Sequence, residues 1–152
     1  MPHTFHKILL HYVWSTKNRL PLINKNLRTK LIEHIKEYAK ENEIEIDTIN
    51  VVSDHVHLLT TLTPVQSPSK VVNLLKGESS NWINSNNLSK GKFSWQEGYG
   101  VFSVSFSSVA SIRKYINNQI KHHRKVSYLE EVDNFLKAYH IYQNKRGTRE
   151  RR

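Results

Sequence analysis

Two apolar segments separated by only two residues place the strongest constraint on the fold of this chain. Residues 44–52 and 55–62 are rich in Ile, Val, Leu and Thr, and Ser53-Asp54 joins them. So short a connection requires antiparallel strands, because a parallel pair needs a crossover of about a dozen residues. The sequence therefore predicts a β-hairpin, around which the other elements must be arranged.

The hydrophobic pattern of the remaining chain predicts strands and helices on both sides of this hairpin. Strands are apolar or alternating, whereas helices repeat their apolar residues every three or four positions. Strands are expected at 5–14, 44–52, 55–62 and 95–106, and helices at 27–42, 67–82, 108–123 and 128–139. A Ser-Pro start at Ser67 and a capping box at Ser127 and Glu130 support two of the helix starts. Gly98 and Gly100 indicate a bulge or a close backbone approach in the last strand.

The order of these elements is β-α-β-β-α-β followed by two helices, which matches the ferredoxin-like arrangement. We therefore expect an α+β fold with a ferredoxin-like (RRM-like) antiparallel sheet. Helices are expected on one face, with a tyrosine-bearing helix near the open face. The 152 residues are enough for one compact core and too few for two. A single domain is expected over 1–140, followed by a basic, flexible tail over 141–152.

Composition narrows the class of partner. A net charge of +10 attracts polyanions, of which nucleic acid is the commonest in a cell, although a basic surface can also serve solubility alone. The chain has no cysteine, which excludes disulfides and thiolate–zinc sites. No segment has the apolar length of a membrane span or of a signal peptide, so a cytoplasmic protein without a membrane partner is expected.

A histidine pair lies in the second strand of the hairpin. Side chains two apart in a strand share a face, so His55 and His57 point away from the apolar face of Val56 and Leu58. Neutral imidazoles there could bind a divalent cation, and Asp54 could orient one of them. Chance His-x-His pairs on half-exposed strands are the alternative explanation.

A second polar set lies on the helix expected at 108–123. Tyr115 and Gln119 are four residues apart and share a face beside an apolar stripe, and His122 follows on that face seven residues after Tyr115. Such a face is typical of a helix that lies across an active site. A solvated helix face with a half-buried tyrosine is the alternative.

Together the two sets suggest phosphodiester chemistry. A phenol can attack phosphorus only where charge on the phosphoryl oxygens is neutralised, as a divalent metal held by two histidines and an oxygen ligand would do. The product would be a covalent phosphotyrosine. Histidine and oxygen ligands suit Mg²⁺ or Mn²⁺ in a nuclease-like role, while zinc or nickel could bind the same set.

Several motifs occur in the order typical of one family. The chain resembles the single-tyrosine HUH transposases of small insertion sequences, a group that includes the REP-associated tyrosine transposases. The resemblance covers residues 6–125 and is carried by YVW at 12–14, TKNR at 16–19, DHVHLL at 54–59, WQEGYGVFS at 95–103, YINNQ at 115–119 and HH at 122–123.

This resemblance implies roles for individual residues. His55 and His57 would be paired metal ligands, Gln119 the third ligand, and Tyr115 the nucleophile that becomes linked to a DNA 5′-phosphate and frees a 3′-hydroxyl. Members act on single-stranded DNA, recognise hairpins near element ends and work as dimers with composite active sites. The chain is thus expected to be a metal-dependent single-strand DNA endonuclease and strand transferase.

Two other functions stay open at this point. One is a replication-initiator or relaxase-type nickase with the same chemistry, and the other is a catalytically inactive, domesticated nucleic-acid-binding module. In all three cases cations would contact the DNA backbone. The candidates are Lys17, Arg19, Lys90, Lys92, Lys114, Lys121 and Arg124.

Overall fold

The computed structural model describes residues 3–122, 126–143 and 149–151. It divides into two compact units, residues 1–119 and 120–152. The strands of the first unit are β1 (Ile8–Ser15), β2 (Glu45–Val51), β3 (His55–Leu62) and β4 (Gly100–Val104). Its helices are η1 (Lys17–Arg19), α1 (Lys25–Glu41), α2 (Pro68–Ser85), η2 (Phe106–Ser108) and α3 (Val109–Asn117). Then follow α4 (Gln119–His122), α5 (Tyr128–Ala138), β5 (Ile141–Gln143) and β6 (Arg149–Arg151).

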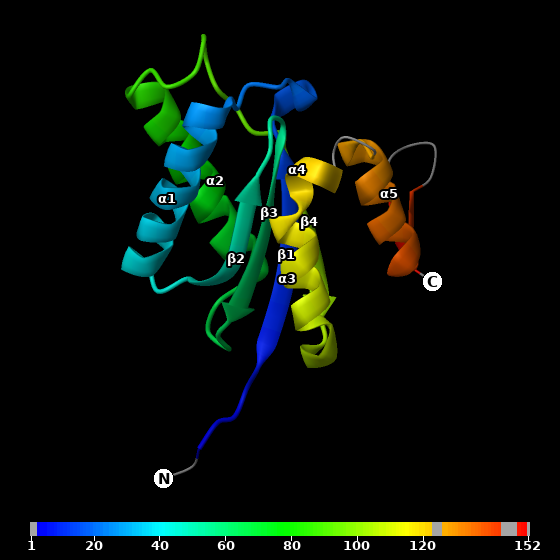
Figure 1. The fold of residues 1–152 in the computed structure, drawn as a ribbon. Helices are drawn as coiled ribbons and strands as arrows, with labels where there is room; N and C mark the ends of the chain where they lie inside the picture. The colour runs from blue at the N-terminus through cyan, green and yellow to red at the C-terminus, as the bar shows by residue number, and fades with distance from the viewer. Residues whose placement is uncertain (1–2, 123–125, 144–148, 152) are drawn as a thin grey trace. The chain divides into compact units, whose positions relative to one another are not determined.

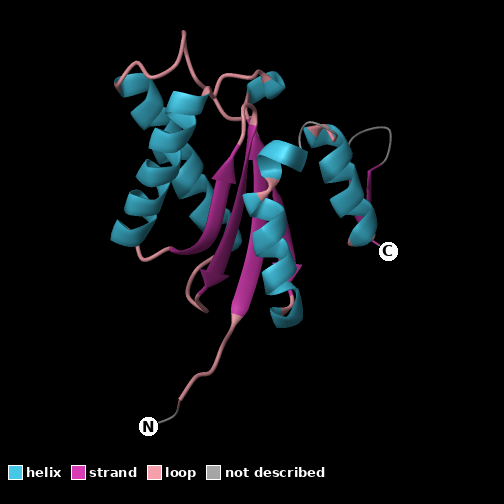
Figure 2. Ribbon diagram, viewed as in Figure 1, coloured by secondary structure: helices cyan, strands magenta, loops and turns pink. Residues whose placement is uncertain are grey.

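The first unit is built on one antiparallel sheet with the strand order β2-β3-β1-β4 (Figure 1). The predicted hairpin forms the β2–β3 pair, and β1 lies beside β3 with Val13 opposite His57 and Ser15 opposite His55. Figure 2 shows helices on both sides of this sheet. The ferredoxin-like prediction is confirmed.

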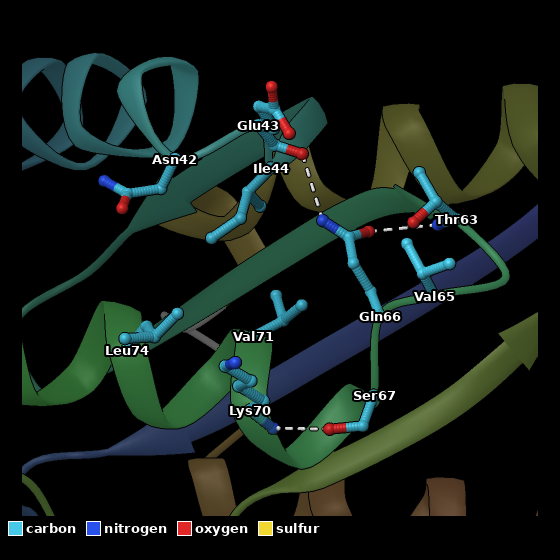
Figure 3. Close-up of a pocket in the computed structure, with 10 residues that line it drawn as sticks. All are labelled: Asn42, Glu43, Ile44, Thr63, Val65, Gln66, Ser67, Lys70, Val71 and Leu74. Atoms are coloured by element: carbon cyan, nitrogen blue, oxygen red, sulfur yellow. Dashed lines mark hydrogen bonds between the residues drawn. The ribbon is translucent and has the colours of Figure 1, made fainter.

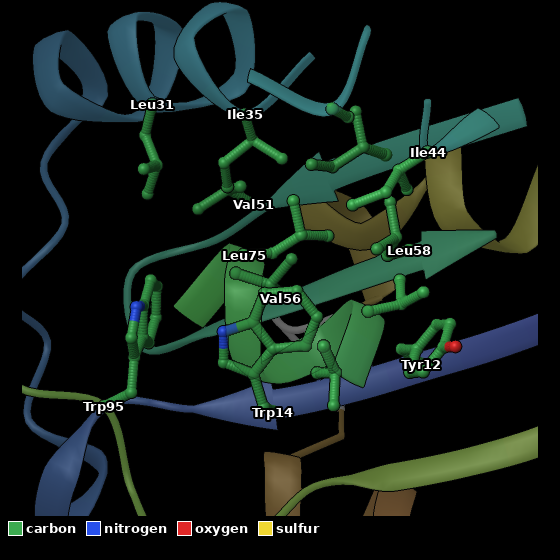
Figure 4. Close-up of a cluster of buried hydrophobic side chains, with 14 of the residues drawn as sticks. Tyr12, Trp14, Leu31, Ile35, Ile44, Val51, Val56, Leu58, Leu75 and Trp95 are labelled. Carbon is green, nitrogen blue, oxygen red and sulfur yellow. The ribbon is translucent and has the colours of Figure 1, made fainter. Parts of the chain in front are cut away.

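The two faces of the sheet are covered by different helices. α1 and α2 pack on one face, where Leu31, Leu75, Val56 and Leu58 belong to a large buried core (Figure 4). α3 packs on the other face through a smaller apolar cluster, formed by Leu9, Leu59, Val109 and Ile116. Because side chains alternate along β3, the face that carries Leu59 also carries His55 and His57. The predicted division of the two faces is therefore correct.

The strands predicted at 5–14 and 95–106 both begin later in the structure than expected. β1 begins at Ile8 rather than at Phe5, whose side chain is 91% exposed and has no core to join. β4 begins only at Gly100, because Gly98 takes a left-handed φ of 83° that an extended strand cannot continue through. Gly100 itself is a close approach, since an added Cβ would lie 2.9 Å from Cγ1 of Val13.

The helix predicted at 108–123 is interrupted. α3 ends at Asn117, Asn118 is its C-cap with φ −96° and ψ 16°, and α4 restarts at Gln119. Asparagine is a weak helix former, so two in succession provide the place for the break. The helical period therefore cannot be carried from Tyr115 to His122, and their prediction as one helix face was wrong.

The second unit contains α5, which begins with the predicted cap. Oγ of Ser127 accepts a hydrogen bond from the Glu130 backbone N–H at 3.2 Å. His122 belongs to this unit, and its Nε2 lies 3.1 Å from Oε2 of the buried Glu131. β5 and β6 pair with each other. Residues 144–148 and 152 of the predicted flexible tail lie outside the described residues.

Candidate active site

The two predicted histidines lie close together at the start of β3. Ring nitrogens of His55 and His57 lie within 4.8 Å of each other, and both side chains are buried. Their separation follows from the strand itself, because side chains two apart project from the same face of the pleat. Two imidazoles so close can donate to one divalent cation.

Each histidine is held by a second side chain. Nδ1 of His55 lies 2.7 Å from Oδ1 of Asp54, as predicted for that carboxylate. Nδ1 of His57 lies 2.9 Å from Nε2 of His11, and the two rings are stacked with centroids 5.1 Å apart. A partner on one ring nitrogen fixes the orientation of the imidazole and directs its other nitrogen, as is usual for metal-binding histidines.

His11 is the functional neighbour that sequence reasoning missed. It lies in the first strand, and nothing in its local sequence pattern ties it to His57. The β1–β3 register sets Val13 opposite His57, which places His11 one position further along the same face. The sequence shows a histidine in each of two predicted strands. Whether these histidines meet depends on the register in which the strands pair.

Tyr115 lies over this histidine group. Its ring meets His57 edge-on, with centroids 5.5 Å apart, and also meets His11 edge-on at 6.2 Å. The side chain is half-buried, because α3 packs its apolar side against Leu59 of the sheet. The phenol is thus brought to the imidazoles by packing of the same chain.

Gln119 follows Tyr115 by about one turn and is fully buried. Its Nε2 donates to the backbone carbonyl of Tyr115 at 3.2 Å, whereas its Oε1 has no hydrogen-bond partner among the described residues. A buried carbonyl oxygen without a partner loses about 1–3 kcal/mol of solvation. Such an oxygen is also a good ligand for a hard cation. Two imidazoles and this amide therefore fit a divalent metal.

The other predicted residues are dispersed. Lys17 and Lys92 line a cavity of about 210 Å³ with Asn18 and Ser94. Lys90, Lys114 and Lys121 are exposed, as are Lys17, Arg19 and Lys92. Arg124 lies outside the described residues, and His122 belongs to the second unit with Glu131 as its partner.

The loop that carries Lys17 is anchored to the histidine end of the sheet. Thr16 donates its backbone N–H to the Asp54 carbonyl at 2.8 Å, and Lys17 donates to Ser94 at 2.9 Å. Asn18 and Arg19 both take left-handed φ values, of 57° and 54°. Two consecutive strained residues persist only where surrounding contacts hold them, and they often mark functional loops.

A second cavity, of about 330 Å³, is separate from these residues. Glu43, Gln66, Ser67 and Lys70 are among the residues that line it (Figure 3). It lies at the Leu62 end of β3, which at roughly 3.3 Å per residue is about 23 Å from His55. This cavity therefore takes no part in the histidine–tyrosine site.

Comparison with known proteins identifies the fold and the family. A REP-associated tyrosine transposase, solved bound to a REP hairpin, superimposes with a TM-score of 0.62 at 16% identity, over 83% of this chain and 74% of that chain. A presumed transposase from Deinococcus radiodurans R1 superimposes with a TM-score of 0.63 at 30% identity, over 78% of this chain and 95% of that chain. The fold is thus that of the tyrosine transposases.

The sequence comparisons are more specific. The family model described as "Transposase IS200 like" matches residues 4–119. The ISDra2 transposase TnpA of Deinococcus radiodurans is 32% identical over 114 residues, which are 72% of this chain and 81% of that protein. The chain belongs to the IS200-like transposase family, and it is therefore a DNA endonuclease and strand transferase. In the described part of the chain, no helix is both long and apolar enough to cross a membrane.

Proposed function

We propose that the protein cleaves and rejoins single-stranded DNA with Tyr115 as the nucleophile. The observation that carries this proposal is the edge-on contact between Tyr115 and His57, at 5.5 Å between centroids. It brings the phenol to a pair of histidines on the face of the sheet that α3 covers. A tyrosine on a solvated helix face would point towards solvent instead of contacting buried histidines.

The reaction would proceed by in-line displacement at phosphorus. The phenolic oxygen of Tyr115 forms a bond to the phosphorus and gives up its proton. The bond from phosphorus to the 3′-oxygen of the preceding nucleotide breaks, and that oxygen takes up a proton to become a free 3′-hydroxyl. Attack by another 3′-hydroxyl on the phosphotyrosine reverses these steps and rejoins DNA, because one phosphodiester is exchanged for another.

His55, His57 and Gln119 would hold a divalent cation, Mg²⁺ or Mn²⁺ by the chemistry of the ligands. When bound, such a cation withdraws charge from the phosphoryl oxygens and aligns the scissile phosphate. Asp54 and His11 would each hold Nδ1 of one histidine, so that Nε2 serves as the ligand atom. The buried Oε1 of Gln119, which has no hydrogen-bond partner among the residues that the structure describes, supports its place in this set.

The DNA is proposed to run from the histidines towards the cavity between Lys17 and Lys92. The Thr16–Asp54 hydrogen bond places that loop beside the start of β3, and both cations can contact phosphates. The REP hairpin in the related structure supports a hairpin-bearing single strand as substrate. A homodimer is also proposed, since family members act as dimers, and either its own or the partner's tyrosine could then complete each site.

The decisive experiment uses Tyr115→Phe. Labelled single strands from the DNA that flanks the gene would be incubated with protein and Mg²⁺ or Mn²⁺, and covalent adducts resolved on a denaturing gel. The wild type should form an adduct with a 5′-phosphate and release a 3′-hydroxyl, whereas Tyr115→Phe should bind DNA normally and form none. An adduct on the Phe variant would overturn the assignment. DNA binding without any wild-type adduct would favour the inactive binding module.

A further inference from the structure

Asn50 lies beside the candidate site without belonging to it. It is on β2, directly opposite His57 in the β2–β3 register, and its side chain is buried. Its Nδ2 donates to the backbone carbonyl of Ile116 at 2.9 Å. Its Oδ1 accepts from Nη2 of Arg28 and from the backbone N–H of Val51, both at 3.0 Å. Both ends of this buried amide are therefore engaged.

The neighbours allow only one orientation of the amide. A guanidinium and a backbone N–H can only donate, so they must face the amide oxygen of Asn50. The Ile116 carbonyl can only accept, so it must face the amide nitrogen. Arg28 is itself fixed, because its Nε donates to the Val51 carbonyl at 2.6 Å. Arg28 belongs to α1, so a continuous set of hydrogen bonds runs from α1 through β2 to α3.

The contact falls at a critical place in the tyrosine helix. Ile116 is the residue after Tyr115, and its carbonyl belongs to the last turn of α3, where the backbone N–H of the C-cap residue Asn118 also points towards it. The helix breaks two residues further on, and Gln119 begins α4. Asn50 thus holds the backbone between Tyr115 and Gln119, directly above His57.

A second contact between β2 and α3 is an exposed ion pair, which fixes the position of α3 less firmly. Arg113 donates to both oxygens of Asp47 at 2.8 and 2.7 Å, but its side chain is 53% exposed. Exposed ion pairs are screened by solvent and define a position poorly, whereas a buried hydrogen bond has no competing water. The Asn50 amide is therefore the contact that sets where the C-terminal turn of α3 lies.

We infer that Asn50, aligned by Arg28, is a positioning residue for the strand-transfer reaction. It touches neither DNA nor the proposed metal, and it acts by holding Tyr115 over His57 and by setting where Gln119 begins. This inference rests on the proposed function. It predicts that loss of the Asn50–Ile116 hydrogen bond lowers the rate of tyrosine attack while leaving DNA affinity unchanged.

The test is the nearly isosteric variant Asn50→Asp. Its carboxylate keeps an acceptor for Arg28 and Val51 and places a second oxygen, instead of a donor, against the Ile116 carbonyl. The rate constant of adduct formation at saturating DNA and Mg²⁺ should fall by about 10- to 100-fold, since displacements near 1 Å have such effects. The dissociation constant for DNA should stay within about twofold, and the new Asp–Arg28 pair should keep the unfolding temperature close to that of the wild type.

Asn84→Asp is the matched control. The Asn84 amide also donates to a backbone carbonyl and accepts from a backbone N–H, both of Phe93, at 2.9 and 2.8 Å. It belongs to α2, away from the tyrosine helix. This variant should lower the unfolding temperature and leave the rate constant unchanged. If Asn50→Asp does not fold, Arg28→Met removes the alignment but keeps the Ile116 bond, and a smaller fall in rate is expected.

A wild-type rate constant in Asn50→Asp would overturn the inference, as would an equal loss of rate in the Asn84→Asp control. Either result leaves the proposed function intact, provided that Tyr115→Phe forms no adduct. An adduct on Tyr115→Phe would instead remove the proposed function itself. The two failures are therefore distinguishable in one set of assays.

Discussion

The two faces of the four-stranded sheet are built from different kinds of side chain. The face under α1 and α2 is filled with large apolar groups such as Leu31 and Leu75, whereas the face under α3 buries His11, His57 and Asn50 beside a small apolar cluster. Buried apolar groups stabilise the fold in proportion to the area they remove from water, whereas hydrogen bonds of buried polar groups largely replace those made with water, so the α3 face contributes less to stability per residue. The α1–α2 face therefore supplies stability that the polar groups of the α3 face do not.

The largest effect on the chemistry of the α3 face is expected from a substitution of His57. His57→Ala should abolish adduct formation and remove the metal response of the fold. In the wild type, Mg²⁺ or Mn²⁺ at 100 times its dissociation constant should raise the free energy of unfolding by about 2.7 kcal/mol, because metal binds only the folded site. Thermal melts with and without chelator measure this difference. A variant that is still stabilised by the cation would show that the metal binds elsewhere.

The next effect is expected on the opposite face. Leu31→Ala leaves a cavity in the core and should lower the free energy of unfolding by about 2–5 kcal/mol, measured by urea denaturation. Under conditions where the variant is folded, its rate constant for adduct formation should match that of the wild type. A loss of rate in the folded variant would mean that the two faces are coupled more closely than proposed.

A smaller effect is expected at the cavity beside the histidines. The double variant Lys17→Ala and Lys92→Ala should weaken binding of single-stranded DNA and reduce the slope of log K against log salt by roughly 1.4, since each phosphate contact contributes about 0.7. Lys36→Ala with Lys40→Ala, both exposed on α1, is the control with the same loss of charge. Equal changes in the two double variants would show that DNA binding depends on total charge and not on the cavity that Lys17 and Lys92 line.

The smallest effect, on the free energy of unfolding, is expected from the exposed ion pair between Arg113 of α3 and Asp47. Hydrogen bonds from Arg113 hold the pKa of Asp47 below its usual value. The ionised Asp47 therefore stabilises the fold above the unfolded pKa of about 3.9, and this contribution is lost as the pH falls through the lower folded pKa. Asp47→Asn should be slightly less stable than the wild type at pH 7. Urea titrations should show that gap closing below pH 4, and a constant gap would contradict the role of ionisation.

Local spacing predicted that His55 and His57 share one face of a strand, and the structure places their ring nitrogens within 4.8 Å of each other. Asp54 adjoins His55 in the sequence, and Tyr115 and Gln119 were expected on one helix face, although the break at Asn118 separates α3 from α4 between them. The break at Asn118 was missed, because the propensity of two asparagines does not reveal that a side chain from β2 takes the Ile116 carbonyl. The contact of His11 with His57 was missed because it depends on the register between strands.

The amino-acid sequence was sufficient for the order of elements, the faces of the residues in β3 and the family, since these depend on periodicity and on motifs within short segments. Packing between elements sets which faces meet, where the tyrosine helix ends and which buried polar groups hold the site. These two groups of features differ in the distance along the chain over which they act. Periods of two and 3.6 residues act within one element, whereas His11, Asn50 and Arg28 act across strands and helices that only packing brings together.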